Sequence, residues 1–137
     1  MGSTVSQAYE LARSTRLKAY APYSKYLVGA SIKIKGQDKI ISGCNVENAS
    51  YGATICAERN AIFAAIAEYG KIEIEFIVLV TDNKDGAVPC AMCLQVIAEF
   101  SQPNTNIYIG NLIEVVKSFE FRELLPNSFS SISLPKE

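Results

Sequence analysis

Residues 55–93 read ICAERNAIFAAIAEYGKIEIEFIVLVTDNKDGAVPCAMC, and this stretch decides the fold class. The alanine-rich segment over 54–69 predicts a helix whose surface is small enough for close packing. The segment over 76–80 is a continuous apolar run, and it predicts a strand that is buried on both faces. Pro89 indicates that a second helix, over 90–100, begins there, because proline is favoured at the entry to a helix.

The sequence on either side of this stretch supplies the other elements. Apolar spacing predicts an opening helix over 4–19, and alternating polarity predicts a hairpin. The hairpin strands cover 26–35 and 39–46, two later strands cover 107–109 and 113–116, and a helical turn covers 122–125. Strands that alternate with helices predict an α/β fold whose sheet is covered on both faces. In the helix over 54–69, the side chains expected in the core are Ile55, Ile62, Phe63 and Ile66.

The composition indicates one globular domain over residues 1–137 that needs no disulfides. Hydrophobic residues make up 49% of the chain, charged residues make up 20%, and the formal net charge is −1. Because the chain has no basic field and no apolar run of about 18 residues, we expect neither a nucleic-acid partner nor a membrane partner. Four cysteines are too few for a disulfide scaffold, so we expect a cytoplasmic location.

The chain contains no histidine. This excludes Ser-His-Asp and Cys-His catalysis, and it excludes every metal site that uses imidazole. A zinc ion in this protein would therefore need cysteine or carboxylate ligands.

Three of the cysteines are expected in the first turns of the two helices that flank the buried strand. Cys56 lies in the first turn of the first of these helices, and Cys90 and Cys93 form a C-x-x-C pair in the second. A helix N-terminus stabilises a thiolate, so two facing N-termini can gather three thiolates around one point. Three cysteines and one water are a ligand set that a catalytic zinc ion can take.

The two residues Glu58 and Arg59 suit such a site. Glu58 follows Cys56 closely enough to reach an open coordination position, where a carboxylate can move protons to and from a water molecule. Three thiolates on Zn²⁺ leave a net charge of about −1, which weakens the metal as a Lewis acid. Arg59 lies three residues after Cys56, so we expect it to share that helix face and to offset the charge by hydrogen bonds to sulfur.

Cys44 leaves an alternative open. On a predicted strand it is best interpreted as a small buried hydrophobe. It can also complete a closed four-cysteine structural zinc site, which would leave Glu58 and Arg59 without a role. A redox pair formed by Cys90 and Cys93 is a third interpretation, and it leaves Cys56 and Glu58 unexplained.

These residues match a known pattern. Zinc nucleobase deaminases carry H/C-x-E followed by P-C-x-x-C, and this chain has Cys56-Ala57-Glu58 followed by Pro89-Cys90-Ala91-Met92-Cys93. The chain resembles the small, homotetrameric cytidine deaminases that have a three-cysteine zinc site. The resemblance covers residues 19–130 and continues in APYSKYLVGA (21–30), NVENASYGATICAERNAIF (45–63) and ELLPNSFS (123–130).

The resemblance implies a three-layer α/β/α fold around a five-stranded mixed sheet, one zinc ion per subunit and a homotetramer. It implies hydrolytic deamination of cytidine and 2′-deoxycytidine, with release of ammonia, in pyrimidine salvage. Zinc-activated water would attack C4 of the base, and Glu58 would carry protons to N3 and to the leaving amine. The zinc ligands would be Cys56, Cys90 and Cys93.

The resemblance also implies the residues that bind the substrate. Asn45 and Glu47 would bind the ribose 3′-hydroxyl, and residues two apart on a strand do share a face, although a solvated strand edge shows the same pattern. Ala57 would offer its backbone to the base, and Tyr51 and Phe129 would come from neighbouring subunits.

The chain departs from the family pattern at three positions. Tyr26 stands where phenylalanine is usual in the wall of the pocket, and its hydroxyl changes the polarity there. Ala91 adds a methyl group near the metal, and Leu94 removes a cation, which makes Arg59 the remaining nearby cation.

Two rival functions remain open at this point. The same fold can act on another aminopyrimidine, such as a nucleoside antibiotic, although the carboxylate of Glu47 suits a ribose hydroxyl better. The protein can also be a structural-zinc binding module without activity, and that reading requires Cys44 as a ligand.

Overall fold

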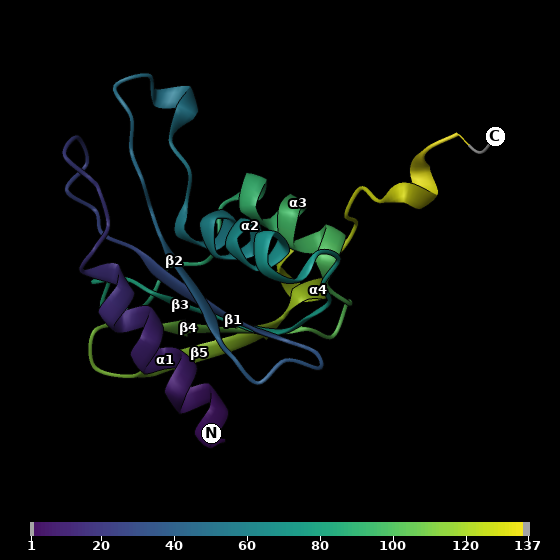
Figure 1. Cartoon of the computed structure of the whole chain (residues 1–137), viewed down its shortest axis with the longest axis horizontal. Helices are drawn as coiled ribbons and strands as arrows, with labels where there is room; N and C mark the ends of the chain where they lie inside the picture. The colour runs from purple at the N-terminus through teal and green to yellow at the C-terminus, as the bar shows by residue number, and fades with distance from the viewer. Residues whose placement is uncertain (1, 136–137) are drawn as a thin grey trace.

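A computed structural model describes residues 2–135, which form a mixed five-stranded sheet with helices on both faces (Figure 1). The strand order is β2-β1-β3-β4-β5, and neighbours are antiparallel except β3 and β4, which are parallel. The strands are β1 (Gly29–Ile34), β2 (Ile41–Cys44), β3 (Ile74–Val80), β4 (Asn106–Gly110) and β5 (Val115–Glu120). The predicted α/β class and the mixed sheet are therefore confirmed.

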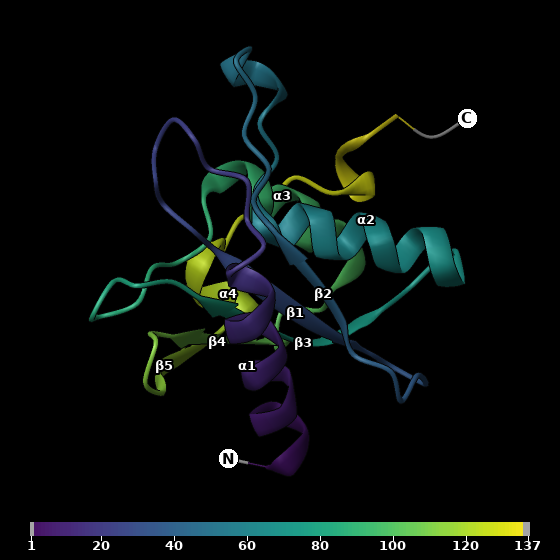
Figure 2. The same ribbon diagram turned by 60° about the vertical axis from the view of Figure 1, so that its left-hand side comes forward.

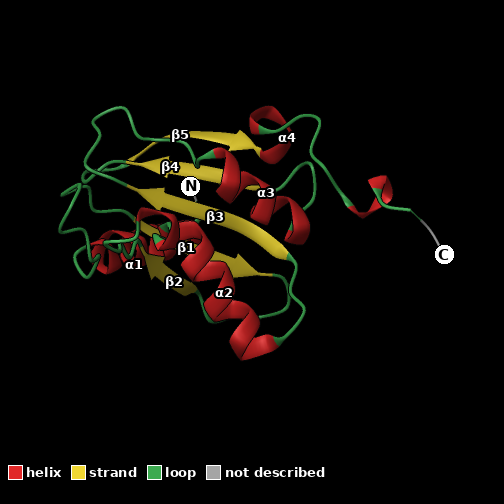
Figure 3. Ribbon diagram, turned by 90° about the horizontal axis from the view of Figure 1, so that it is seen from above, coloured by secondary structure: helices red, strands yellow, loops and turns green. Residues whose placement is uncertain are grey.

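The helices form the two outer layers. Helix α1 (Ser3–Arg16) lies on one face of the sheet, and α2 (Ala57–Tyr69) and α3 (Ala91–Phe100) lie on the other (Figures 2 and 3). The short segments are α4 (Phe121–Leu124) and the 3₁₀ turns η1 (Tyr51–Ala53) and η2 (Ser131–Ser133). Among residues 2–135, no helix has the length and the apolar character that a membrane span requires.

Strand β3 is buried on both faces, as its apolar run predicts. Ile77 and Leu79 pack in the cluster under α2 and α3, whereas Val78 and Val80 pack against α1. Alternate residues of one strand thus belong to two cores, which requires that both faces be apolar.

The position of α2 depends on a close approach to β2 at Gly43. A Cβ atom at this position would lie 2.5 Å from the backbone nitrogen of Ala61 and 2.8 Å from the carbonyl oxygen of Ala57. Only glycine allows the strand and the helix to come this close. The contact fixes where α2 begins, and α2 in turn carries Glu58.

Both α2 and α3 begin at the carboxyl end of β3. Helix α3 follows β3 through the loop over 81–90. Helix α2 precedes β3 in the chain, and it ends near the residue where β3 begins. The two helices contact each other. The topology therefore brings the two helix N-termini together at one edge of the sheet.

Several predicted boundaries and one predicted burial are wrong: the strand predicted over 113–116 begins at Val115, and Phe63 is exposed. Helix α2 begins at Ala57 rather than at residue 54, and α1 ends at Arg16 rather than at residue 19. Ile113 is 85% exposed in a turn, because the side chain of Asn111 accepts hydrogen bonds from the backbone N–H groups of residues 113 and 114. Phe63 is 46% exposed, because it lies outside the buried face of α2, which is formed by Ala57, Glu58, Ala61, Ile62 and Ala65.

Candidate active site

The sulfur atoms of Cys56, Cys90 and Cys93 lie within 4.8 Å of one another. Cys56 and Cys90 are the N-cap residues of α2 and α3, with extended backbones, so they precede the first turns in which they were expected. Cys93 is the third residue of α3 and is fully buried. Pro89 lies one residue before the N-cap rather than inside the helix. The predicted meeting of two helix N-termini is what places the three sulfurs together.

This donor set suits a zinc ion. Tetrahedral zinc with bonds of about 2.3 Å to sulfur holds its thiolates about 3.8 Å apart, which is within the observed spread. The neighbouring thiol of Cys93, and then Arg59, lower the pKa of Cys56 to about 5. The same contact with Cys56, together with burial, raises the pKa of Cys93. The site therefore gathers negative charge that a divalent cation would neutralise.

Cys44 does not belong to this group. It ends β2, where it is half-buried, and burial raises the pKa of its thiol. Within the described residues, the three other cysteines are the only cluster of three or more potential metal ligands. This arrangement disagrees with the closed four-cysteine site, and Cys44 is half-buried rather than the buried apolar residue that the sequence predicts.

Glu58 is the second residue of α2 and is only 4% exposed. It lines the same cavity as Cys56 and Cys90. Burial raises the pKa of its carboxyl group to about 7, and the charge of Cys56 adds to this increase. A carboxyl group in such surroundings can accept and release a proton near neutral pH.

Arg59 faces the sulfurs, as its spacing from Cys56 predicts. Its Nη2 donates a hydrogen bond to the sulfur of Cys56 at 3.6 Å. Its Nε atom is buried and has no hydrogen-bond partner among residues 2–135. A half-buried guanidinium that donates to the Cys56 sulfur is placed to offset the charge of the cluster.

The substitution Arg59→Gln is expected to weaken zinc binding about tenfold to a hundredfold, because it removes the positive charge beside the thiolates. Competition with a chelator, followed by metal analysis, measures this. Arg13→Gln, which changes an exposed arginine on α1, is the matched control. Wild-type zinc affinity and turnover in Arg59→Gln would refute the charge-offset role.

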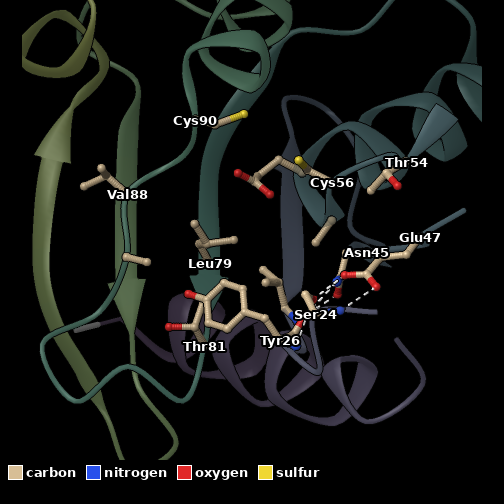
Figure 4. Close-up of a pocket in the computed structure, with 14 residues that line it drawn as sticks. Ser24, Tyr26, Asn45, Glu47, Thr54, Cys56, Leu79, Thr81, Val88 and Cys90 are labelled. Atoms are coloured by element: carbon tan, nitrogen blue, oxygen red, sulfur yellow. Dashed lines mark hydrogen bonds between the residues drawn. The ribbon is translucent and has the colours of Figure 1, made fainter. Parts of the chain in front are cut away.

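A cavity of about 250 Å³ opens beside the sulfurs (Figure 4). Four of the predicted substrate residues line it, namely Tyr26, Asn45, Glu47 and Ala57. Its other walls come from the loops before β1 and after β3, from the segment between η1 and α2, and from β3 itself: Ser24, Val28, Thr54, Leu79, Thr81, Ala87 and Val88.

Asn45 and Glu47 hold the segment that carries Tyr26. The amide of Asn45 donates to the carbonyl of Tyr26 and accepts from the N–H of Val28, both at 2.8 Å. The carboxylate of Glu47 accepts from the backbone N–H groups of Tyr23 and Ser24 and from the Ser24 hydroxyl. The Ser24 hydroxyl, with the two backbone donors, lowers the pKa of Glu47. Glu47 is therefore a fixed anion at the mouth of the cavity.

The structure does not bring Tyr51 and Phe129 to this cavity within one chain. Tyr51 is 76% exposed in η1, and its ring packs edge-on against Tyr23 with the centroids 5.9 Å apart. Phe129 is 56% exposed, and its carbonyl accepts a hydrogen bond from Gln95. Figure 1 shows the C-terminal segment leaving the body of the molecule.

Sequence reasoning missed part of the cavity wall. Thr81 is 1% exposed and lies directly after the buried strand β3. Its place at the carboxyl end of a parallel strand is a signal that could have found it, since ligands bind at that edge. Leu94, where the family pattern has a cation, is buried in the core under α2 and α3.

The comparisons with known proteins agree with this geometry. The sequence profile for the cytidine and deoxycytidylate deaminase zinc-binding region matches residues 3–109. A cytidine deaminase of Halalkalibacterium halodurans is 43% identical over 113 residues, which are 82% of this chain and 84% of that protein. One of Sporosarcina psychrophila is 38% identical over 122 residues, 89% of this chain and 88% of that protein. The crystal structure of a cytidine deaminase from Burkholderia pseudomallei superposes with a TM-score of 0.83 at 37% identity, covering 94% of this chain and all of that one.

The fold and the cysteine cluster define a zinc-dependent deaminase that holds one metal ion per subunit. The chain belongs to the cytidine and deoxycytidylate deaminase family.

Proposed function

We propose that this protein, as a single deaminase domain over residues 1–137, hydrolyses cytidine and 2′-deoxycytidine to uridine and 2′-deoxyuridine with release of ammonia. The observation that carries the proposal is the buried Glu58 carboxyl group beside three convergent sulfurs in one cavity. The named relatives support the choice of cytidine.

Different residues of the cavity bind the metal and transfer the protons. Cys56, Cys90 and Cys93 hold zinc, which when bound supplies Lewis-acid activation of a water molecule. Glu58 takes a proton from the attacking water and delivers it to N3 of the base. The new C4–O bond forms, Glu58 then takes the proton of the new C4 hydroxyl group and passes it to the amino group, and the C4–N bond breaks to release ammonia.

The rest of the cavity holds the nucleoside. Asn45 and Glu47 bind the ribose 3′-hydroxyl, the backbone of Ala57 binds the edge of the base, and Tyr26 forms a wall. The hydrogen bonds that Glu47 accepts from residues 23 and 24 hold its carboxylate in place before the sugar arrives. A fixed acceptor loses little conformational freedom on binding.

The proposed reaction has a direct test. Zinc-loaded protein is mixed with cytidine, with 2′-deoxycytidine and with other aminopyrimidine nucleosides, and the fall in ultraviolet absorbance and the release of ammonia are followed. We expect turnover of both cytosine nucleosides. Turnover of neither would refute the proposal, and a strong preference for a nucleoside antibiotic would favour the rival substrate class.

Glu47→Gln is expected to raise KM for cytidine by about tenfold or more with a much smaller change in kcat, because a charged acceptor for the sugar becomes a neutral one. Glutamine still offers an oxygen to the backbone N–H groups of residues 23 and 24, so the segment stays in place. Steady-state kinetics measure the effect, with the exposed Glu99→Gln as the matched control. An unchanged KM would remove Glu47 from the sugar site.

We also propose that the protein is a cytoplasmic homotetramer that acts in pyrimidine salvage. The exposed aromatic rings of Tyr51 and Phe129 and the exposed apolar residues Ile132 and Leu134 support an assembly in which these groups close neighbouring cavities. Light scattering should give four times the 14.9 kDa chain mass. A monomer with full activity would contradict both the assembly and the role of Phe129.

A further inference from the structure

The side-chain amide of Asn60 joins the two ends of the cavity. Its Nδ2 donates to the carbonyl oxygen of Cys44 at 2.8 Å and to that of Ile55 at 3.4 Å. Cys44 directly precedes Asn45, and Ile55 directly precedes Cys56. An amide NH₂ group has two hydrogens, so both bonds can exist at once.

The two segments that Asn60 touches are joined by few other bonds, one of which runs from the N–H of Asn48 to the Thr54 hydroxyl at 3.1 Å. Val46 and Ile55 exchange two backbone hydrogen bonds of 3.0 Å and form an isolated antiparallel bridge. Residues 47–54 leave this bridge as a loop that projects from the body (Figure 1). A single bridge is weak by itself. The Asn60 amide adds the bonds that fasten both of its strands to α2.

Asn60 is also tied to Cys56 along the helix, because its backbone N–H donates to the Cys56 carbonyl at 3.1 Å. Inside a helix, asparagine is less favourable than alanine or leucine by roughly 0.5 kcal/mol. Helix propensity therefore does not account for an asparagine here, whereas its two side-chain hydrogen bonds do.

We propose that Asn60 is a positioning residue that fixes the distance between the metal ligand Cys56 and the sugar-binding residues Asn45 and Glu47. The inference rests on the proposed function, in which one nucleoside must touch both ends of the cavity at the same time. Misplacement of one end by about 1 Å can cost a hundredfold in rate. When Asn60 fixes this distance, a nucleoside that is bound by its sugar has its base correctly placed beside Glu58.

The test replaces Asn60 with leucine, which has a similar size and no donors, and uses Asn104→Leu as the matched control at an exposed site. The kcat/KM values for cytidine and for 2′,3′-dideoxycytidine, which lacks the 2′- and 3′-hydroxyls of the sugar, are measured together with zinc affinity by chelator competition. We expect the preference for cytidine over the dideoxynucleoside to fall about tenfold in Asn60→Leu, and zinc affinity to fall about tenfold. The control should change neither quantity.

A purely structural role would lower both kcat/KM values equally, so an unchanged preference and zinc affinity in folded Asn60→Leu would overturn the proposal. Asn60→Asp, which keeps the shape but turns acceptors toward the two carbonyls, carries the same expectation if the leucine variant does not fold. If wild-type protein turns over no cytosine nucleoside, the proposed function fails. Zinc affinity then decides the role of Asn60, and equal affinity in variant and wild type overturns it.

Discussion

Glu58→Ala is expected to give a folded protein that holds one zinc ion per chain and has lost about a thousandfold or more in cytidine turnover. Glu58 lies outside the sulfur cluster, so its removal leaves all three metal ligands in place. It is the buried carboxyl group that lines the cavity beside those sulfurs, whereas the other lining carboxylate, Glu47, lies at the mouth. Metal analysis and steady-state kinetics on the same sample measure both properties.

The variant Glu58→Gln distinguishes the loss of proton transfer from the loss of side-chain volume. Glutamine preserves the size of the side chain but cannot carry a proton, so the loss of turnover should match that of the alanine variant. More than about a tenth of wild-type turnover in either variant would show that another group moves the protons. A zinc-free Glu58→Ala protein would show that the carboxylate holds the metal instead.

Cys93→Ala is expected to abolish both zinc binding and turnover. Cys93 is the fully buried member of the cluster, and its sulfur lies within 4.8 Å of the sulfurs of Cys56 and Cys90. Two remaining cysteines do not make the three-ligand site that a catalytic zinc ion needs. Metal content after dialysis and cytidine turnover are the measurements, and a falling melting temperature should accompany the loss because metal binding stabilises the fold.

Cys44→Ala is the matched control, since Cys44 is a free cysteine on β2 outside the cluster. It should keep one zinc ion per chain and wild-type turnover. Loss of metal from Cys44→Ala would restore the closed four-cysteine site and would undermine the catalytic interpretation. Retention of zinc by Cys93→Ala would do the same.

An element of the fold could be predicted wherever a local sequence pattern favoured one type of secondary structure. The apolar run over 76–80 could only be a strand between two layers, and it became the centre of the sheet as β3. The strand order was less accessible, because the pairing of β1 with β3 joins residues about fifty positions apart. Phe63 was misplaced because apolar character alone cannot show which face of α2 packs on the sheet, and that face carries three alanines and Ile62.

The metal end of the site was predictable and the sugar end only in part. The metal ligands could be predicted because the C-x-x-C spacing and the expected starts of two helices are local features of the sequence. A helix N-terminus stabilises a thiolate. The bonds from residues 23 and 24 to Glu47, and from Asn60 to two carbonyls, join distant segments through side chains. Such contacts produce no repeating pattern in the amino-acid sequence, so they can be seen only in the folded structure.

The N-cap positions of Cys56 and Cys90 carry a consequence for how the protein matures. An N-cap residue has its final geometry only when its helix has formed, and these two helices are separated in the chain by the whole of β3. The three sulfurs therefore converge only after α2 and α3 have docked on the sheet. Metal uptake and folding are then one coupled event, and the ion acts as a cross-link that closes the chain around its central strand.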